Sequence, residues 1–254
     1  MNADEIIALL DRKTDYQLNL FNREFDAVIR RLSDLVILSA VNQIKDPINF
    51  DVVFNGLLVE SGFYALINDF IDNSYDKTYD EIIELLKLSG IDLTFDSNDL
   101  ETIRQLKLFD LETFTNIGTQ AGSQLKKDLF KYSLSNLSNA EIADNIRLAL
   151  IDTPLAKYAK TYAETSINNF QQQVIDSKVE GIEGLVYIYR GPTPDKKIRD
   201  FCKCVINQNK YYDKSNAIKL KNDKRRKWNC RHKVIPITET FAISEGYEKG
   251  KFTC

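Results

Sequence analysis

The sequence of 254 residues has few chain-breaking residues and a single histidine. Ten glycines and five prolines leave little room for long irregular loops, so a largely helical chain is expected. No apolar stretch approaches the ~18 residues that a transmembrane helix needs. One histidine excludes motifs that need two, such as HExxH, and neither a GxxxxGK[ST] loop nor a GxGxxG turn occurs. We therefore expect no conventional metabolic enzyme.

The N-terminus does not have the pattern of an export signal. Acidic residues, Asp4 and Glu5, precede its apolar residues, whereas a signal peptide places basic ones there. We expect the chain to stay in the cytoplasm where it is made, or to enter a particle assembled there, without a membrane partner.

Periodicity and capping signals predict helices over most of the first 180 residues. Apolar residues recur at helical spacing, and the pairs Thr78–Glu81 and Ser138–Glu141 fit the capping-box pattern. Pro154 predicts the first turn of a helix that reaches about residue 178.

After Gly184 the spacing of apolar residues no longer fits a continuous helix. Residues 185–190 are rich in β-branched and aromatic side chains and predict a strand, whereas residues 196–205 fit a short helix. Residues 234–237 predict a further extended piece. The expected fold is mainly α, with a multi-helix N-terminal body over residues 1–180 and a small α+β C-terminal module over residues 181–254.

The net charge of -3 conceals two regions of opposite sign. Residues 184–254 hold 17 basic and 7 acidic side chains, a net +10, whereas residues 1–183 hold 17 and 30, a net -13. The densest basic stretch contains Lys221, Lys224, Arg225, Arg226 and Lys227. Such a cluster is either a solvated loop or a contact for a phosphate backbone, which needs only grouped Lys and Arg.

All four cysteines lie in the last quarter of the chain. Without an export signal, disulfides are not expected. Cys202 and Cys204 are followed 25 residues later by Cys230 and His232, which together offer three sulfurs and one imidazole. This is a ligand set for structural zinc, although zinc modules usually separate paired ligands by two or more residues.

Other interpretations of the cysteines stay open. They can pack as small hydrophobic residues without a metal. Cys202 or Cys230 could instead pair with His232 as a nucleophile and base, as in a toxin-like Cys–His enzyme. Cys254 is expected to be an exposed free thiol without a role.

Three segments then occur in order through the last third of the chain. Residues 158–169 (YAKTYAETSINN) give a helix with alanines, a Glu164-Thr165 pair and an asparagine a few residues on. Residues 189–202 (YRGPTPDKKIRDFC) join an aromatic strand to a turn, an Asp, an Arg and a Cys, and residues 229–236 (NCRHKVIP) close the series. Together they resemble the phage head-morphogenesis proteins, the Mu F-like minor head family.

The resemblance is partial in two places. Ala163 precedes Glu164 where the family often has Arg-Thr, and the Lys-rich stretch replaces the small residues that usually come before the last Cys element. The resemblance also implies that Gly191 shapes the turn. Asp195 and Arg199 are four residues apart and could pair across one helical turn.

The resemblance implies a structural or assembly role in the virion. Such a minor capsid protein would lie at the portal vertex or in the head interior, contact portal and capsid proteins, and aid capsid assembly and DNA packaging. The basic module could then face packaged DNA. No catalytic residue is carried over. A zinc-stabilised nucleic-acid-binding protein without a head role is the alternative.

Overall fold

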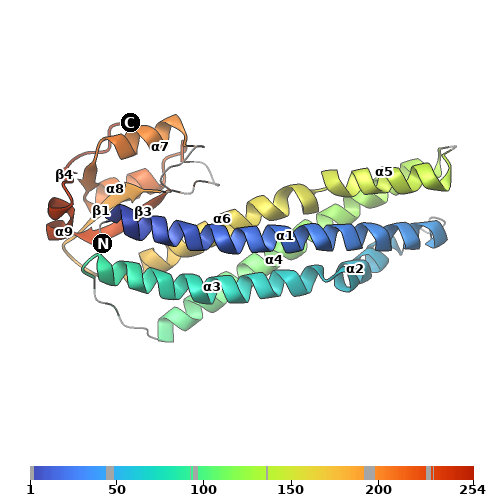
Figure 1. The fold of residues 1–254 in the computed structure, drawn as a ribbon, viewed down its shortest axis with the longest axis horizontal. Helices are drawn as coiled ribbons and strands as arrows, with labels where there is room; N and C mark the ends of the chain where they lie inside the picture. The colour runs from blue at the N-terminus through green and yellow to red at the C-terminus, as the bar shows by residue number, and fades with distance from the viewer. Residues whose placement is uncertain are drawn as a thin grey trace. The chain divides into compact units, whose positions relative to one another are not determined.

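The computed structural model describes residues 3–43, 49–91, 93, 97–135, 137–191, 198–226, 230 and 232–254. Helices dominate this part of the chain, and the longer ones come first (Figure 1). The first six are α1 (Ala3–Gln43), α2 (Phe50–Ser61), α3 (Phe63–Leu88), α4 (Ser97–Ser133), α5 (Asn139–Asp152) and α6 (Pro154–Lys178). The rest are β1 (Leu185–Arg190), α7 (Asp200–Asn207), β2 (Lys210–Tyr212), α8 (Lys214–Lys221), β3 (Lys233–Thr238), α9 (Glu239–Ser244) and β4 (Glu248–Lys249). The predicted fold class is confirmed: a multi-helix N-terminal body followed by a small module with a mixed sheet and helices.

Local sequence signals account for several of these boundaries. The Ser138 side chain accepts a hydrogen bond from the Glu141 backbone N–H, and the Glu141 carboxylate accepts one from the Ser138 N–H, so this capping box is confirmed. Helix α6 begins at Pro154 as predicted. The Thr78 capping box is wrong, because Thr78 lies buried in the middle of the continuous helix α3.

Among the described residues, no single helix is both long and apolar enough to cross a membrane. The bent pair α2 and α3, with 55° between the two helices, passes the same test by length and composition alone.

The chain packs into two compact units that differ from the predicted division at residue 180. Unit 1 comprises Met1–Tyr16, Tyr75–Arg104 and Glu164–Cys254. Unit 2 comprises Gln17–Ser74 and Gln105–Ala163. The C-terminal module therefore shares a unit with segments of four helices that precede it in the sequence.

Unit 2 has an aromatic core. Phe21 lies 4.4 Å from Phe70 between ring centroids, and Phe70 meets Phe114 edge-on at 6.3 Å. Tyr162 lies edge-on to Phe114 at 4.9 Å and donates a hydrogen bond to the buried Asp110. This pair puts a carboxyl group inside an otherwise apolar helical core.

In unit 1 the strands form one sheet in the order β3-β1-β2-β4. Strand β1 is antiparallel to both neighbours, and β2 runs parallel to β4. The outer edge of β3 is closed by a helix side chain: the Gln172 amide donates to the Val234 carbonyl and accepts from the Val234 N–H, both at 3.1 Å. Pro236, which lacks an N–H, is tolerated because β3 is an edge strand. Gln172 therefore protects an edge that could otherwise pair with another strand.

Two buried ion pairs join elements of unit 1: one links strand β3 to helix α1, and the other links helix α6 to helix α4. The Lys233 Nζ lies 3.2 Å from an Asp11 carboxylate oxygen, and the Lys178 Nζ lies 2.5 Å from Asp99. All four side chains are about nine-tenths buried or more. Removing one partner of such a pair leaves a buried charge without its counter-ion, which is strongly destabilising. The module is thus anchored to helical segments far away in the sequence.

Candidate metal centre

Three of the four predicted zinc ligands come together in unit 1. Cys202 lies on α7, and Cys230 and His232 precede β3. One donor atom from each lies within 4.8 Å of the others. The Cys230 Sγ is 3.8 Å from the Cys202 Sγ and 3.8 Å from the His232 Nδ1. Cys202 and His232 are buried and Cys230 is half-buried, so these residues form a cluster that could hold a metal ion.

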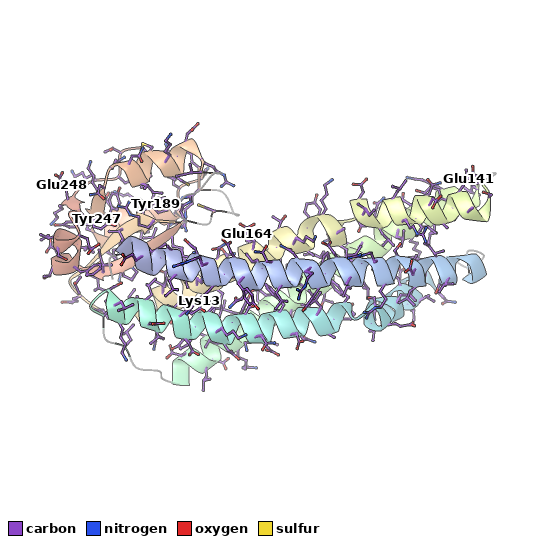
Figure 2. All side chains as sticks on the ribbon, viewed as in Figure 1. Lys13, Glu141, Glu164, Tyr189, Tyr247 and Glu248 are labelled. Carbon is purple, nitrogen blue, oxygen red and sulfur yellow. A yellow bond between two sulfur atoms is a disulfide. The ribbon has the colours of Figure 1, made fainter. Side chains whose placement is uncertain are left out.

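Tyr189, which is labelled in Figure 2, contacts all three members of this cluster. Its hydroxyl group lies 3.3 Å from the Cys202 Sγ and 3.4 Å from the Cys230 Sγ. Its ring stacks on the His232 imidazole, with 5.6 Å between centroids. Burial, with the neighbouring thiols, raises the pKa of the Tyr189 phenol, so it stays a neutral hydrogen-bond donor. Tyr189 thus positions both sulfurs and the imidazole.

The Cys202 and Cys230 side chains form a hydrogen bond, with their sulfurs 3.8 Å apart. The hydrogen bond from Cys202 lowers the pKa of Cys230 although burial opposes the shift, and contacts with His232 and Tyr189 lower it further. The same hydrogen bond, together with burial, raises the pKa of Cys202. Cys230 is therefore the member that ionises first. A thiolate is the form that binds a metal ion or acts as a nucleophile.

A glycine creates the space for the imidazole. A Cβ atom at Gly191 would lie 2.3 Å from the His232 Cδ2 and 2.7 Å from its Cγ. The ring can reach the thiols only because residue 191 has no side chain. Sequence reasoning gave Gly191 a role in the turn but missed this contact.

Replacing Gly191 with alanine should therefore displace His232. We expect a loss of about 1–3 kcal/mol in the free energy of unfolding, because the buried ring must shift. Gly56→Ala is the matched control. Nothing lies within 4 Å of a Cβ at Gly56 on helix α2, so that change should be neutral or slightly stabilising. Denaturant unfolding of both variants checks this, and equal effects would contradict the role of Gly191.

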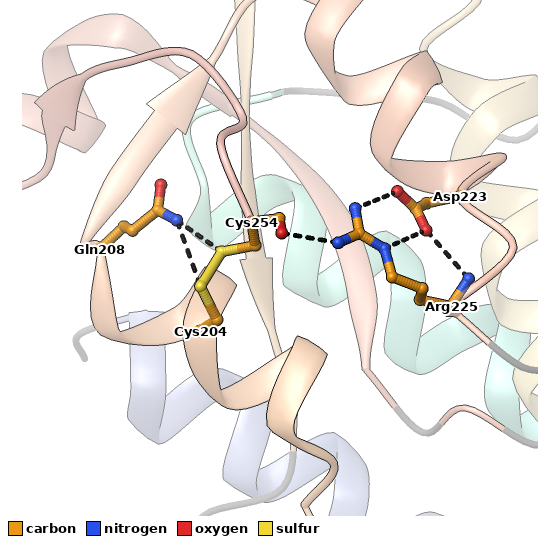
Figure 3. The surroundings of a disulfide bond; sticks show 5 residues. All are labelled: Cys204, Gln208, Asp223, Arg225 and Cys254. Carbon is orange, nitrogen blue, oxygen red and sulfur yellow. Dashed lines mark hydrogen bonds and ion pairs between the residues drawn. A yellow bond between two sulfur atoms is a disulfide. The ribbon is translucent and has the colours of Figure 1, made fainter.

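The fourth predicted ligand does not join the cluster. Cys204 forms a disulfide with Cys254 (Figure 3), so the predictions of no disulfide and of a free Cys254 thiol are both wrong. Helix geometry explains the separation: residues i and i+2 point about 200° apart, so Cys202 faces the core while Cys204 is exposed. A Cys-x-Cys pair on a helix cannot bind one ion with both sulfurs.

Most of the predicted phosphate-binding residues make contacts within the chain. Lys221 pairs with Asp176. Arg225 pairs with Asp223 and lies 4.6 Å from the centre of the Phe201 ring. Arg226 donates to the His232 carbonyl at 2.8 Å, and its guanidinium lies 5.9 Å from the centre of the Tyr189 ring. Lys224 is exposed. Lys227 and Asp195 lie outside the described residues, so the predicted Asp195–Arg199 pair stays a prediction.

Arg226 therefore supports the metal centre. It holds the backbone of one candidate ligand, His232, and its charge lies over the tyrosine that contacts both thiols. The basic stretch contributes to the structure of the module as well as to its charge, which the sequence pattern alone did not indicate.

No family model, curated protein or solved structure matches this chain.

Proposed function

We propose that this protein is a structural and assembly protein of a bacteriophage head, a minor capsid protein of the Mu F-like kind. It would contact portal and capsid proteins at the portal vertex or in the head interior and would aid capsid assembly and DNA packaging. One observation carries the proposal. Residues of the second and third segments that resemble this family contact one another in unit 1, and helix α6, which carries residues 164–169 of the first, reaches the edge of β3 through Gln172.

Specific contacts join these segments. Tyr189 and Arg190, the first residues of the second segment, end strand β1 and pair with Val234 and Lys233 of the third. Cys202 of the second segment contacts Cys230 of the third. Gln172, three residues beyond the first segment on helix α6, closes the edge of β3. If these residues matched the family only in their order along the chain, they would not need to contact one another. The contacts between them therefore support the proposal.

We also infer that the Cys202–Cys230–His232 cluster binds zinc as a structural ion. Two sulfurs bound tetrahedrally at ~2.3 Å from one zinc ion lie ~3.8 Å apart. The Cys202 and Cys230 sulfurs are 3.8 Å apart, which matches this spacing. Two thiolates and an imidazole are a ligand set that zinc favours, and zinc would hold α7 against the segment that enters β3.

Quantitative mass spectrometry of purified phage particles tests the head assignment. We expect a few to about a dozen copies of this chain per particle, as befits a component confined to one vertex. The assembly lysate is the reference sample. Absence from particles, with abundance in the lysate, would contradict a virion component and favour the nucleic-acid-binding alternative. That alternative predicts salt-sensitive DNA binding by the full chain.

The contact between Cys230 and His232 also permits an enzyme with a thiolate nucleophile. The two candidates differ in what bound zinc does. Zinc occupying both side chains would block a nucleophile, whereas it is essential to a structural centre. Loss of a measured activity on adding zinc would favour the enzyme.

A further inference from the structure

Several contacts fasten residues 250–254 to the rest of unit 1, beginning with the Gly250 N–H, which donates to the Tyr211 carbonyl at 3.1 Å. Cys254 forms the disulfide with Cys204 on helix α7. Arg225 donates to the Cys254 carbonyl at 2.6 Å, and Asp223 holds Arg225 through two of its nitrogens (Figure 3). Phe252 lies edge-on to Phe201, with 5.7 Å between centroids. We call residues 250–254 the C-terminal strap.

The strap packs against the same core that contains the metal centre. Helix α7 carries both groups of contacts, since Phe201 and Cys204 meet the strap while Cys202 faces Tyr189 and Cys230. Phe252 and Cys254 pack on the buried cluster that includes Cys202, as does Cys230 itself. Freeing the strap would therefore remove cover from the two free thiols.

The disulfide is open to attack from one side. Cys204 is exposed, so a small thiolate in solution can approach its sulfur. The Gln208 Nε2 lies 2.6 Å from the Cys254 Sγ but 3.8 Å from the Cys204 Sγ. A hydrogen-bond donor at a sulfur stabilises the thiolate that leaves during exchange. The geometry therefore favours attack at Cys204 with Cys254 as the leaving group.

We propose that the Cys204–Cys254 disulfide is a thiol-sensitive latch that controls access to Cys202 and Cys230. A low-molecular-weight thiolate bonds to the Cys204 sulfur as the S–S bond breaks, and Cys254 leaves as a thiolate. A second thiol then attacks the mixed disulfide and releases reduced Cys204 and a small-molecule disulfide. Two electrons pass from the two small thiols to the protein disulfide. The strap then detaches from α7, and the thiols of the metal centre become accessible.

The proposed latch controls access to the thiols of Cys202 and Cys230, and this control does not depend on whether zinc is bound. It is therefore tested on the full chain after treatment with a chelator, so that a failure to bind metal cannot imitate a failure of the latch. The readout is the rate at which N-ethylmaleimide labels Cys202 and Cys230, followed by mass spectrometry of peptides. Trypsin cleavage at Lys203 separates the Cys202 peptide from the Cys204 peptide.

We expect Cys254→Ser and Cys204→Ser to be labelled at Cys202 and Cys230 about tenfold faster than the oxidised protein, because local opening limits the reaction. The two variants break the same bond and should behave alike. Thr253→Ala, an exposed change within the strap, should leave the rates unchanged. Equal labelling of the oxidised protein and both serine variants would overturn the proposal.

A serine variant that unfolds would lose its near-ultraviolet circular dichroism. In that case the unmodified chain is equilibrated in glutathione buffers of increasing reducing strength. Labelling of Cys230 should then rise in step with the fraction of chains whose Cys204–Cys254 bond is reduced. A labelling rate that stays constant while this bond is reduced overturns the latch. Gln208→Leu should slow the reduction several-fold, because Cys254 loses its hydrogen-bond donor.

Discussion

Replacing Cys230 with serine is expected to abolish zinc binding and to destabilise unit 1 by about 3 kcal/mol or more. Cys230 is the central ligand of the cluster, because its sulfur lies 3.8 Å from both the Cys202 sulfur and the His232 nitrogen. A serine hydroxyl is a poor zinc ligand, and its shorter bond from Cβ carries the oxygen away from Cys202 and Tyr189. The loss thus combines the free energy of metal binding with a disrupted hydrogen-bond network.

The measurement has two parts. Elemental analysis of the full chain should give one zinc per chain for the unmodified protein and none for Cys230→Ser. Denaturant unfolding, with and without a chelator, should show that chelation destabilises the unmodified protein only. His232→Ala and Cys202→Ser should behave like Cys230→Ser.

Cys204→Ser and Cys254→Ser provide the matched controls. Each removes a cysteine from the same module but no ligand of the centre, so each should retain one zinc per chain. Loss of zinc from Cys204→Ser would show that the predicted four-ligand set holds in the reduced protein. Full zinc content in Cys230→Ser would contradict the metal centre itself.

The sequence was informative wherever a local chemical signal decides the structure. Pro154 suits the first turn of a helix, where its missing N–H is not needed, and residues 185–190 form the strand β1 that their β-branched and aromatic side chains predict. The same kind of signal failed at Thr78, because a capping box stabilises only the first turn of a helix and Thr78 lies inside α3. Nothing near Thr78 interrupts the apolar period of α3, so burial of the helix outweighed the pattern.

The candidate site was partly predictable because the residue types themselves are a local chemical signal. Cys202, Cys230 and His232 were identified from residue type and grouping alone. Cys204 was assigned to the same site because the spacing along the chain is short. That spacing becomes a separation of about 200° once the residues lie on a helix. The helix predicted over residues 196–205 already contains both cysteines, so its geometry would have removed Cys204 from the ligand set had it been applied to the spacing.

Other parts of the site carry no local signal. Gln172 lies in the middle of a helix, and its role depends on the strand that packs beside it 62 residues later. Arg226 was read as part of a charged surface because it follows other basic residues, yet it supports the backbone of His232. These contacts follow from tertiary packing, which one sequence does not specify by pattern.

Replacing Asp110 with asparagine is expected to stabilise unit 2 at neutral pH and to have little effect near pH 4. Asp110 is 7% exposed, and burial raises its pKa from 3.8 to about 6, although the Tyr162 hydrogen bond acts in the opposite direction. The protonated carboxyl group thus favours the folded state. Its stabilising contribution is complete below pH 3.8 and is lost as the pH rises through about 6.

The expected difference in the free energy of unfolding follows from the size of the Asp110 pKa shift. A shift of about two pKa units corresponds to about 3 kcal/mol between low and neutral pH. Asparagine keeps an oxygen that accepts from the Tyr162 hydroxyl, which donates to Asp110 at 2.5 Å, but it never ionises. Denaturant unfolding of Asp110→Asn and the unmodified protein at several pH values from 4 to 8 measures the effect.

Glu112→Gln is the matched control, since Glu112 lies on the same helix α4 and is exposed. Removing that charge should change stability by less than about 0.5 kcal/mol at any pH. The two stability curves for Asp110→Asn and the unmodified protein should meet near pH 4, diverge as the pH rises to about 6, and stay about 3 kcal/mol apart above it. Curves that run parallel over this range would mean that Asp110 ionises alike in the folded and unfolded chain. The carboxyl group would then be reached by water, and the helical core around Phe114 and Tyr162 would open more readily than its packing indicates.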